Sequence, residues 1–248
     1  MLFFEAPSTT TSNLDSSCGA SCYGDYVTFM PIASQPIPCN TFLTPPHQRM
    51  ITNDFTTRLH VAPPNLPATC NDVAKITVYN DVNNVQGTEQ IVDMSGLTEI
   101  SLINNTVIGF SSYVGQMVTN RHGSIIDEDG ITAHGHFMHY VPSVQEWVTG
   151  KTQFYTLAKD CILEFYADIN GSDPDSIQLD GHPLSSLKFD KNPLPIFGNK
   201  YSQFIVKIKG HGLHTLVNNG NYVAYVICKN VGGPNDAAGY LTGFNKRK

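Results

Sequence analysis

The sequence predicts an all-β protein, folded as one antiparallel β-sandwich or as two packed or duplicated sandwich units. Its 248 residues include 18 Val, 18 Ile and 21 Thr against only 12 Ala and 6 Glu. This balance favours strands, because β-branched residues prefer strands whereas Ala and Glu favour helices. Strand-like segments also recur at intervals of about 8–12 residues, which is typical of sandwiches and barrels. The 20 Gly and 15 Pro supply the turns between them.

The first half opens with a stretch rich in Ser, Thr and Gly, residues 1–20, which we expect to be a flexible leader. The first strand is predicted at Tyr26–Met30 and ends at Pro31, because proline cannot donate to a sheet ladder. Four further strand-like segments follow in this half: Ala74–Tyr79, Thr98–Leu102, Thr106–Phe110 and Val114–Thr119.

Two segments of the second half carry the clearest strand patterns. In Phe204–Lys209 apolar residues alternate with Lys207 and Lys209, so one face of this strand should be wet. Tyr222–Cys228 is apolar on both faces and should lie at the centre of a sheet. A short helix is expected at Val144–Val148. Further strands are predicted at Thr132–Tyr140, Gln153–Leu157, Cys161–Ala167, Leu184–Phe189 and His214–Val217.

A polar, glycine-bearing stretch near the middle of the chain is the candidate boundary between two units. It spans residues 120–130, so we expect one β-sandwich-like unit over residues 21–125 and another over residues 126–248. The two halves also present aromatic and strand-like segments in a similar order, as two units built on one plan would. Chance similarity between amphipathic strands is the alternative.

Charge and hydropathy exclude two classes of partner. The 15 Lys and Arg are outnumbered by 21 Asp and Glu, which gives a formal net charge of −6. An acidic chain has no basis for binding nucleic acid backbones, so no nucleic acid partner is expected. No run of 18 apolar residues occurs, and we therefore expect no membrane insertion.

Cysteines and glycosylation sequons favour an extracellular protein. An even number of cysteines suits a disulfide set, although sequence alone cannot choose the pairing. The candidates are Cys18, Cys22, Cys39, Cys70, Cys161 and Cys228. Two sequons predict glycans at Asn104 and Asn170, and a cytosolic protein with buried thiols is the alternative. No signal peptide is visible, because Glu5 and Pro7 interrupt the apolar start, so we expect a mature fragment or a truncated N-terminus.

A histidine cluster is the sharpest chemical feature of the sequence. His134 and His136 are spaced so that a regular strand would point both rings to one face, as a metal site on a β-scaffold requires. His139 would face the other way unless a bulge intervenes. A third ligand would have to come from elsewhere, with His122, His211 and His214 as the available histidines. The alternative is a set of hydrogen-bonded, partly buried histidines.

Other catalytic patterns are weak in this chain. The acidic stretches 127–130 and 168–175 are clustered carboxylates of the kind that calcium uses, but they do not fit the EF-hand pattern and suit solvated turns better. The sequence contains no nucleophile elbow, P-loop or dinucleotide fingerprint. The single tryptophan, Trp147, is expected to anchor a core.

Residues 141–248 resemble a known family. The resemblance rests on short motifs that recur in order: Leu179–Gly181, Tyr201–Ser202, Gly212–Leu216, Asn221–Val226 and Gly239–Phe244, preceded by Val141–Trp147. These are similar to the N-terminal domains of IgGFc-binding proteins, although Tyr240 is followed here by Leu241 where that family usually has Gly. The resemblance implies a secreted, non-catalytic β-domain for adhesion. It places no binding residue on this chain and does not imply binding of antibody Fc.

We therefore expect an extracellular, non-catalytic adhesion or ligand-binding β-domain, without a cofactor, whose partner is an extracellular protein or glycan. Sandwiches present their loops at the ends of the sheets, so contacts are predicted in the polar, turn-rich loops 120–130, 168–176 and 191–200. Two alternatives remain open at this point. One is an enzyme with a divalent metal on His134 and His136, and the other is a self-assembling structural or coat protein.

Overall fold

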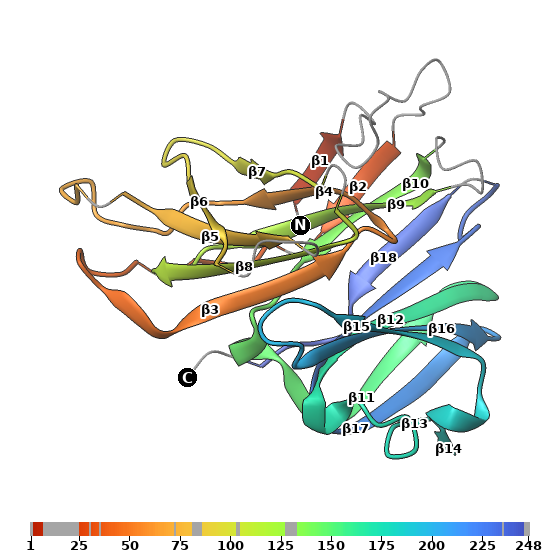
Figure 1. Ribbon diagram of the computed structural model, residues 1–248. Coiled ribbons are helices and arrows are strands. Elements are labelled where there is room, and N and C mark those ends of the chain that lie inside the picture. Colours follow the sequence, from red (N-terminus) through yellow and green to blue (C-terminus); the bar gives the residue numbers. More distant parts are fainter. Residues whose placement is uncertain are drawn as a thin grey trace.

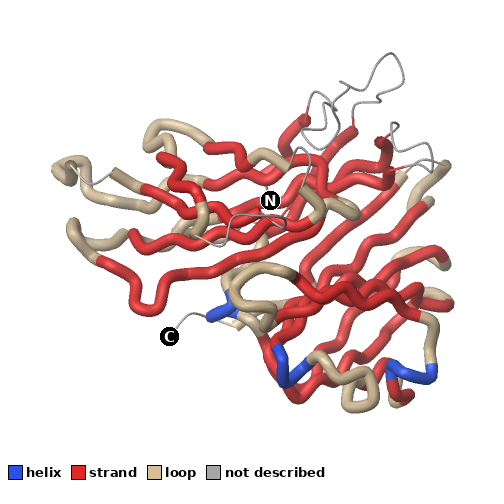
Figure 2. Tube along the Cα trace, viewed as in Figure 1, coloured by secondary structure: helices blue, strands red, loops and turns tan. Residues whose placement is uncertain are grey.

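The chain is all-β, as predicted. The computed structural model describes residues 2–6, 25–29, 31–34, 36–71, 73–80, 86–102, 105–126, 133–234 and 236–245. Strands dominate these residues (Figure 2), and the helical elements among them are short 3₁₀ turns: η1 (Val144–Glu146), η2 (Ile169–Gly171) and η3 (Leu184–Ser186). Across the described part of the chain, no helix is long and apolar enough to cross a membrane.

The described residues up to Tyr140, called the first half from here on, form the strands β1 to β10. They are β1 (Leu2–Ala6), β2 (Asp25–Phe29), β3 (Phe42–Thr52), β4 (Thr56–Val61), β5 (Lys75–Asn80), β6 (Thr88–Ile91), β7 (Thr98–Ile100), β8 (Val107–Val114), β9 (Thr119–Ile126) and β10 (Ala133–Tyr140). Two four-stranded sheets result, with the orders β3-β8-β5-β6 and β10-β9-β4-β7, and β1 pairs with β2. In Figure 1 these strands form the upper part of the molecule. β10 lies after residue 126, where the second unit is predicted to begin, yet it pairs with β9, which lies almost entirely before that residue.

The second half forms one large antiparallel sheet. Its strands are β11 (Val148–Thr156), β12 (Asp160–Asp168), β13 (Gln178–Leu179), β14 (His182–Pro183), β15 (Phe189–Leu194), β16 (Tyr201–Lys209), β17 (Gly212–Lys229) and β18 (Ala237–Leu241). The main order is β14-β13-β17-β12-β16-β15, and β11 and β18 also pair with β17.

The long strand β17 organises this sheet. Its first part pairs with β11 and β13, and its last part pairs with β12 and β18. One strand therefore belongs to two layers, and the sheet curls around its own core (Figure 1). The prediction for Tyr222–Cys228 is confirmed, because this segment lies between two neighbours and is buried throughout. The pattern in Phe204–Lys209 is confirmed too, with its apolar positions buried on β16 and Lys207 and Lys209 exposed.

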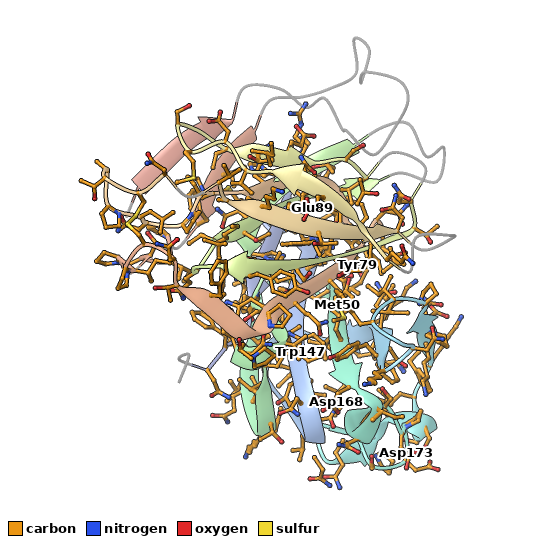
Figure 3. The ribbon with its side chains drawn as sticks, turned by 60° about the vertical axis from the view of Figure 1, so that its left-hand side comes forward. Met50, Tyr79, Glu89, Trp147, Asp168 and Asp173 are labelled. Carbon is orange, nitrogen blue, oxygen red and sulfur yellow. A yellow bond between two sulfur atoms is a disulfide. The ribbon has the colours of Figure 1, made fainter. Side chains whose placement is uncertain are left out.

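The two faces of β12 belong to two different cores. Leu163 and Phe165 are fully buried in a core that lies within the second half. Tyr166 belongs instead to a core shared with the first half, which includes Met50 of β3. Trp147 lies in this joint core, as its expected role as an anchor requires, and Figure 3 labels both Met50 and Trp147. The large sheet of the second half is therefore covered on both faces at β12.

A buried polar network crosses the junction between the halves. Arg121 on β9 donates to Glu164 on β12 at 2.6 Å, and neither side chain is exposed. Glu164 also accepts hydrogen bonds from Tyr166 at 2.7 Å and from Gln203 at 2.9 Å. Burial raises the pKa of Tyr166, so its phenol stays protonated and can donate. Thr52 of β3 completes the network through its backbone N–H, which donates to Tyr166 at 3.0 Å.

Two disulfides cross-link the described chain. Cys161 and Cys228 are direct partners on β12 and β17, and Cys39 is bonded to Cys70 across the start of the first half. Their sequence separations are 67 and 31 residues. Closing loops of this length restricts the unfolded chain and contributes about 4 kcal/mol each in the chain-entropy picture. Disulfides in these positions indicate an oxidising, extracellular-type environment.

Three expected segments are wrong. Leu184–Phe189 was predicted as a strand, but it contains the turn η3, and β15 begins only at Phe189. Val114–Thr119 spans the end of β8, the connection that follows and the start of β9. The stretch 120–130 was predicted as a loop, yet it is strand β9 as far as Ile126 because it pairs with β4 and β10. Residues 127–130 lie outside the described part.

One long strand, β3, was not predicted from the sequence because it contains two prolines. β3 contains Pro45 and Pro46, which argue against a central strand. In the structure they sit where the ladder to β8 is irregular, between Phe42 and His47, so neither proline has to donate to it. The short helix expected at Val144–Val148 is reduced to the single turn η1.

We predict that Glu164→Gln lowers the free energy of unfolding by about 3–5 kcal/mol, because it leaves Arg121 buried without a counter-charge. Urea denaturation measures the change. The double variant Arg121→Met, Glu164→Leu should recover most of the loss, since it removes both charges together. As a control, Glu89→Gln breaks the exposed pair with Lys75 and should cost less than about 1 kcal/mol. Equal losses at Glu164 and Glu89 would contradict the role given to the buried pair.

Candidate functional site

Two connections that are distant in the sequence enclose an open pocket of about 430 Å³ in the second half. Residues 168–176 include the last residue of β12 and lead to β13, and residues 191–200 include the end of β15, up to Leu194, and the connection to β16. The lining residues are Ile169, Ser172, Asp173, Pro174, Lys191, Asn199, Lys200 and Ser202. Figure 3 labels Asp168 and Asp173 at this end of the molecule, far in that view from Glu89 on β6.

Hydrogen bonds fix the first connection against β17. Asp168 accepts from the backbone N–H of Gly171 at 2.9 Å and from the side-chain amide of Asn221 at 2.7 Å. The amide of Asn218 donates to the carbonyl of Gly171 at 3.0 Å. Gly171 and Gly220 approach so closely that a Cβ at Gly220 would collide with the backbone of Gly171. The sequence therefore needs glycine at this contact.

Apolar side chains anchor the second connection. Ile196 and Phe197 pack in the core shared with the first half. The centres of the Phe197 and Tyr79 rings lie 5.1 Å apart there. Phe197, Gly198 and Asn199 all have positive φ, a backbone conformation that residues other than glycine rarely adopt. The packing of Phe197 holds this left-handed turn and leaves the polar residues after it on the pocket side.

Lys191 joins the two walls of the pocket. Its ammonium donates to the carbonyl of Ser172 at 2.7 Å and lies 5.5 Å from the centre of the Phe204 ring. The lining offers ammonium, amide and hydroxyl donors, the carboxylate of Asp173, and the side chain of Ile169, which is 69% exposed. This combination suits noncovalent recognition of a polar ligand with one apolar face.

Sequence reasoning pointed to most of this pocket. Two of the three loops predicted to make contacts, 168–176 and 191–200, contribute residues to its lining. The second prediction is wrong in part, because residues 191–194 belong to strand β15 and pair with β16. The third, 120–130, does not contribute, because its described part is a paired strand. Ser202 was missed, since it belongs to β16 and carries no turn signal.

The histidine pair is only partly described. His134 and His136 both lie on β10, but Gly135 between them has a φ of 61° and the ladder shifts there, so the strand does not alternate regularly. The side chain of His134 lies outside the described residues. Metal binding by His134 and His136 therefore stays a prediction. His139 is buried and stacks on Tyr225 at 4.4 Å. No metal-binding group of three or more His, Cys, Asp or Glu is found among the side chains that the structure describes.

One of the possible third ligands, His122, takes part in a different cluster. Its Nε2 lies 3.1 Å from Nδ1 of His60 on the neighbouring strand β4. Glu99 on β7 approaches His60 at 3.5 Å and accepts from Arg58 at 3.2 Å. Burial, together with the charges of His60 and Arg58, lowers the pKa of His122 to about 4. Burial also lowers the pKa of His60, so both imidazoles are neutral at pH 7. No sequence spacing indicated His60.

The other candidate third ligands serve the turns of the second half. His214 donates from Nδ1 to the carboxylate of Asp180 at 2.7 Å, and its Nε2 lies 3.0 Å from the Thr156 hydroxyl, a connectivity like that of a catalytic triad. Thr156 is fully buried, however, and its hydroxyl also lies 3.2 Å from the carbonyl of Gly210. A nucleophile must reach its substrate, and Thr156 cannot. We therefore assign the hydrogen bonds between Asp180, His214 and Thr156 a structural role, in which they tie β11 to β17. His211 is exposed at the neighbouring turn.

The modification sites predicted from sequence are partly described. Asn170 is exposed within η2, next to Ile169 of the pocket. Asn104, Cys18 and Cys22 lie outside the described residues. The acidic stretch 168–175 is held by hydrogen bonds to neutral donors, as a turn requires, with Asp173 accepting from the backbone N–H of residue 175 at 3.2 Å.

A larger pocket of about 740 Å³ lies between β2, β10 and β18. Its lining is mainly apolar and includes Phe29, Ile32, Met138, Leu241 and Phe244. No sequence motif indicated this pocket, because its residues come from three separate strands and the segments beside them.

Motif residues behind the family resemblance make structural contacts. Asp180 accepts from the backbone N–H of Thr215 at 2.8 Å, and Tyr222 donates to Thr152 at 2.6 Å. A scan against models of known protein families and a search of curated proteins both find no match to this chain. The resemblance to IgGFc-binding N-terminal domains therefore stays a prediction.

We predict that the protein loses stability as the pH falls from 6.5 towards 4. The folded-state pKa of His122, about 4, lies below its unfolded value of 6.5, so in this window the unfolded chain binds one more proton at this site than the native chain. The slope from this residue is at most about 1.4 kcal/mol per pH unit. Urea denaturation at pH 5, 6 and 7 measures it.

The variant His122→Asn should show a shallower dependence of stability on pH than the wild type. His211→Asn removes a histidine at an exposed turn and should keep the wild-type dependence. An unchanged slope in His122→Asn would show that the buried imidazole pair does not control acid stability.

Proposed function

We propose that this protein is an extracellular, non-catalytic binding module that recognises its partner through the pocket between residues 168–176 and 191–200. One observation carries the proposal: two polar connections from different parts of the chain are locked into place around one open pocket. Binding residues are disproportionately found on loops that a rigid scaffold positions. The hydrogen bonds of Asp168 and the packing of Phe197 supply that rigidity.

The partner that suits this pocket is an extracellular protein or glycan. Its lining mixes hydroxyl, amide and charged groups with the exposed side chain of Ile169. Such surfaces favour ligands rich in hydroxyl or amide groups that also present an apolar face. A preformed pocket binds without the cost of ordering its loops, which preserves affinity for a small contact area.

Secretion and glycosylation complete the proposal. The two disulfides support an oxidising compartment. Asn170 is exposed at the start of a sequon, Asn170-Gly171-Ser172, and stands beside the pocket. A glycan there would narrow the approach from one side and would leave the wall formed by residues 191–200 open.

We predict that the pocket variant Asp173→Ala, Asn199→Gly loses at least about tenfold in affinity for extracellular ligands found with the wild type, since two polar contacts are removed. Asn199→Gly keeps the left-handed backbone of the turn. An array of glycans and extracellular proteins finds the ligands, and calorimetry measures affinity. Asp190→Ala, exposed on β15 outside the pocket, is the matched control. Unchanged binding in the pocket variant would reject the assignment of this site.

We also predict glycan occupancy at Asn170 when the chain passes through a eukaryotic secretory pathway. Mass spectrometry of peptides before and after glycosidase treatment detects it, and Asn170→Gln should remove that modification alone. The same non-reducing digest reports the disulfides. An unmodified Asn170 in the secreted protein would argue against the glycoprotein part of the proposal.

A further inference from the structure

Among the residues that line the pocket between the two connections, lysines outnumber carboxylates. Two lysines, Lys191 and Lys200, line it together with a single carboxylate, that of Asp173. This local balance is the reverse of the whole chain, whose formal charge is −6. Neither lysine forms an ion pair within the described part of the chain, so their charges are not neutralised by the protein there.

Two of the three carboxylates in residues 168–176 accept hydrogen bonds from neutral donors, and the third, Asp175, does not line the pocket. Asp168 accepts from the backbone of Gly171 and from the amide of Asn221. Asp173 accepts from the backbone of residue 175. These carboxylates shape the turn and remain unpaired with Lys191 and Lys200, although both lysines line the same pocket. The ammonium groups are therefore available to a ligand from outside.

Lys191 is held in position before any ligand arrives. Its bond to the carbonyl of Ser172 uses one of three N–H donors, and its position over the Phe204 ring restricts the side chain. Two donors remain for a ligand. Lys200, at the end of the connection that leads from β15 to β16, is exposed and makes no hydrogen bond to another described residue. One fixed and one adaptable cation thus line the same opening.

The remaining lining groups suit a sugar ring. Asn199 and Ser202 offer an amide and a hydroxyl, and the Asp173 carboxylate can accept from ring hydroxyls. Ile169 and Pro174 supply an apolar surface for the C–H face of a pyranose. We infer that the pocket binds an acidic saccharide, with the carboxylate or sulfate group of the sugar placed between Lys191 and Lys200. This inference rests on the proposed function and names the ligand class of the same site.

The test uses the full chain and three probes: sialyllactose, which carries a carboxylate, sulfated lactose, and uncharged lactose. Titration by calorimetry or NMR gives each affinity. At least one acidic probe should bind about tenfold or more tightly than lactose, because a hydrogen bond to a charged group is stronger than a neutral one. Raising the salt concentration should weaken the acidic probe and leave lactose unchanged. The preferred acidic probe identifies the source of the charge.

Three lysine variants locate the contact. Lys200→Gln should lower the affinity for the acidic probe about tenfold, and Lys200→Arg should largely preserve it. Lys200 is exposed, so folding is expected to be intact, and thermal unfolding checks this. Lys207→Gln, an exposed lysine on β16 outside the pocket, is the matched control and should bind like the wild type.

Two results would overturn the inference. One is equal affinity for the charged and uncharged probes, or no binding of either acidic probe to the wild type. The other is an acidic probe that binds Lys200→Gln as tightly as the wild type. The proposed function fails separately: it survives if another extracellular ligand is lost in Asp173→Ala, Asn199→Gly while Lys200→Gln binds it normally.

Discussion

The ion pair between Arg121 and Glu164 is the contact on which the arrangement of the two halves depends. Both side chains are excluded from water, and a buried charge without a partner is strongly unfavourable. β9 of the first half and β12 of the second must therefore meet where the guanidinium reaches the carboxylate. Tyr166 and Gln203 donate to the other carboxylate oxygen of Glu164, and the backbone N–H of Thr52 donates to Tyr166, so hydrogen bonds as well as charge specify this junction.

The same junction reaches the proposed binding pocket. Phe197 and Ile196, from the connection that forms one wall, pack in the core that both halves share. The other wall is bonded to β17 through Asn218 and Asn221. A ligand would therefore meet two fixed surfaces, and recognition would depend on the side chains that face the opening. Lys191 contributes both to the fixed position of the walls, because it bonds to Ser172, and to recognition, because it lines the pocket.

Much of the fold followed from local periodicity, and much of the pocket from local composition. Burial could be predicted directly from the residue pattern in Phe204–Lys209 and Tyr222–Cys228, because side chains alternate between the two faces of a strand. β3 escaped the same analysis because its prolines sit at a ladder irregularity that only the partner strand reveals. The polar, turn-rich composition of 168–176 and 191–200 indicated exposure. That both segments line one pocket depends on the pairing of β12, β15 and β16, which no local signal contains.

The sequence by itself determined the class of the protein: a β-rich, cysteine-containing chain of low charge. The alternation of apolar and polar residues along its strands also indicated which strand faces are buried. The tertiary structure alone decided which strands are neighbours, which cysteines pair and where charged side chains converge. The physical reason is range. Strand propensity and amphipathicity act between residues a few positions apart, whereas Arg121 with Glu164, Cys161 with Cys228, and Lys191 with Ser172 meet only after the chain has closed long loops.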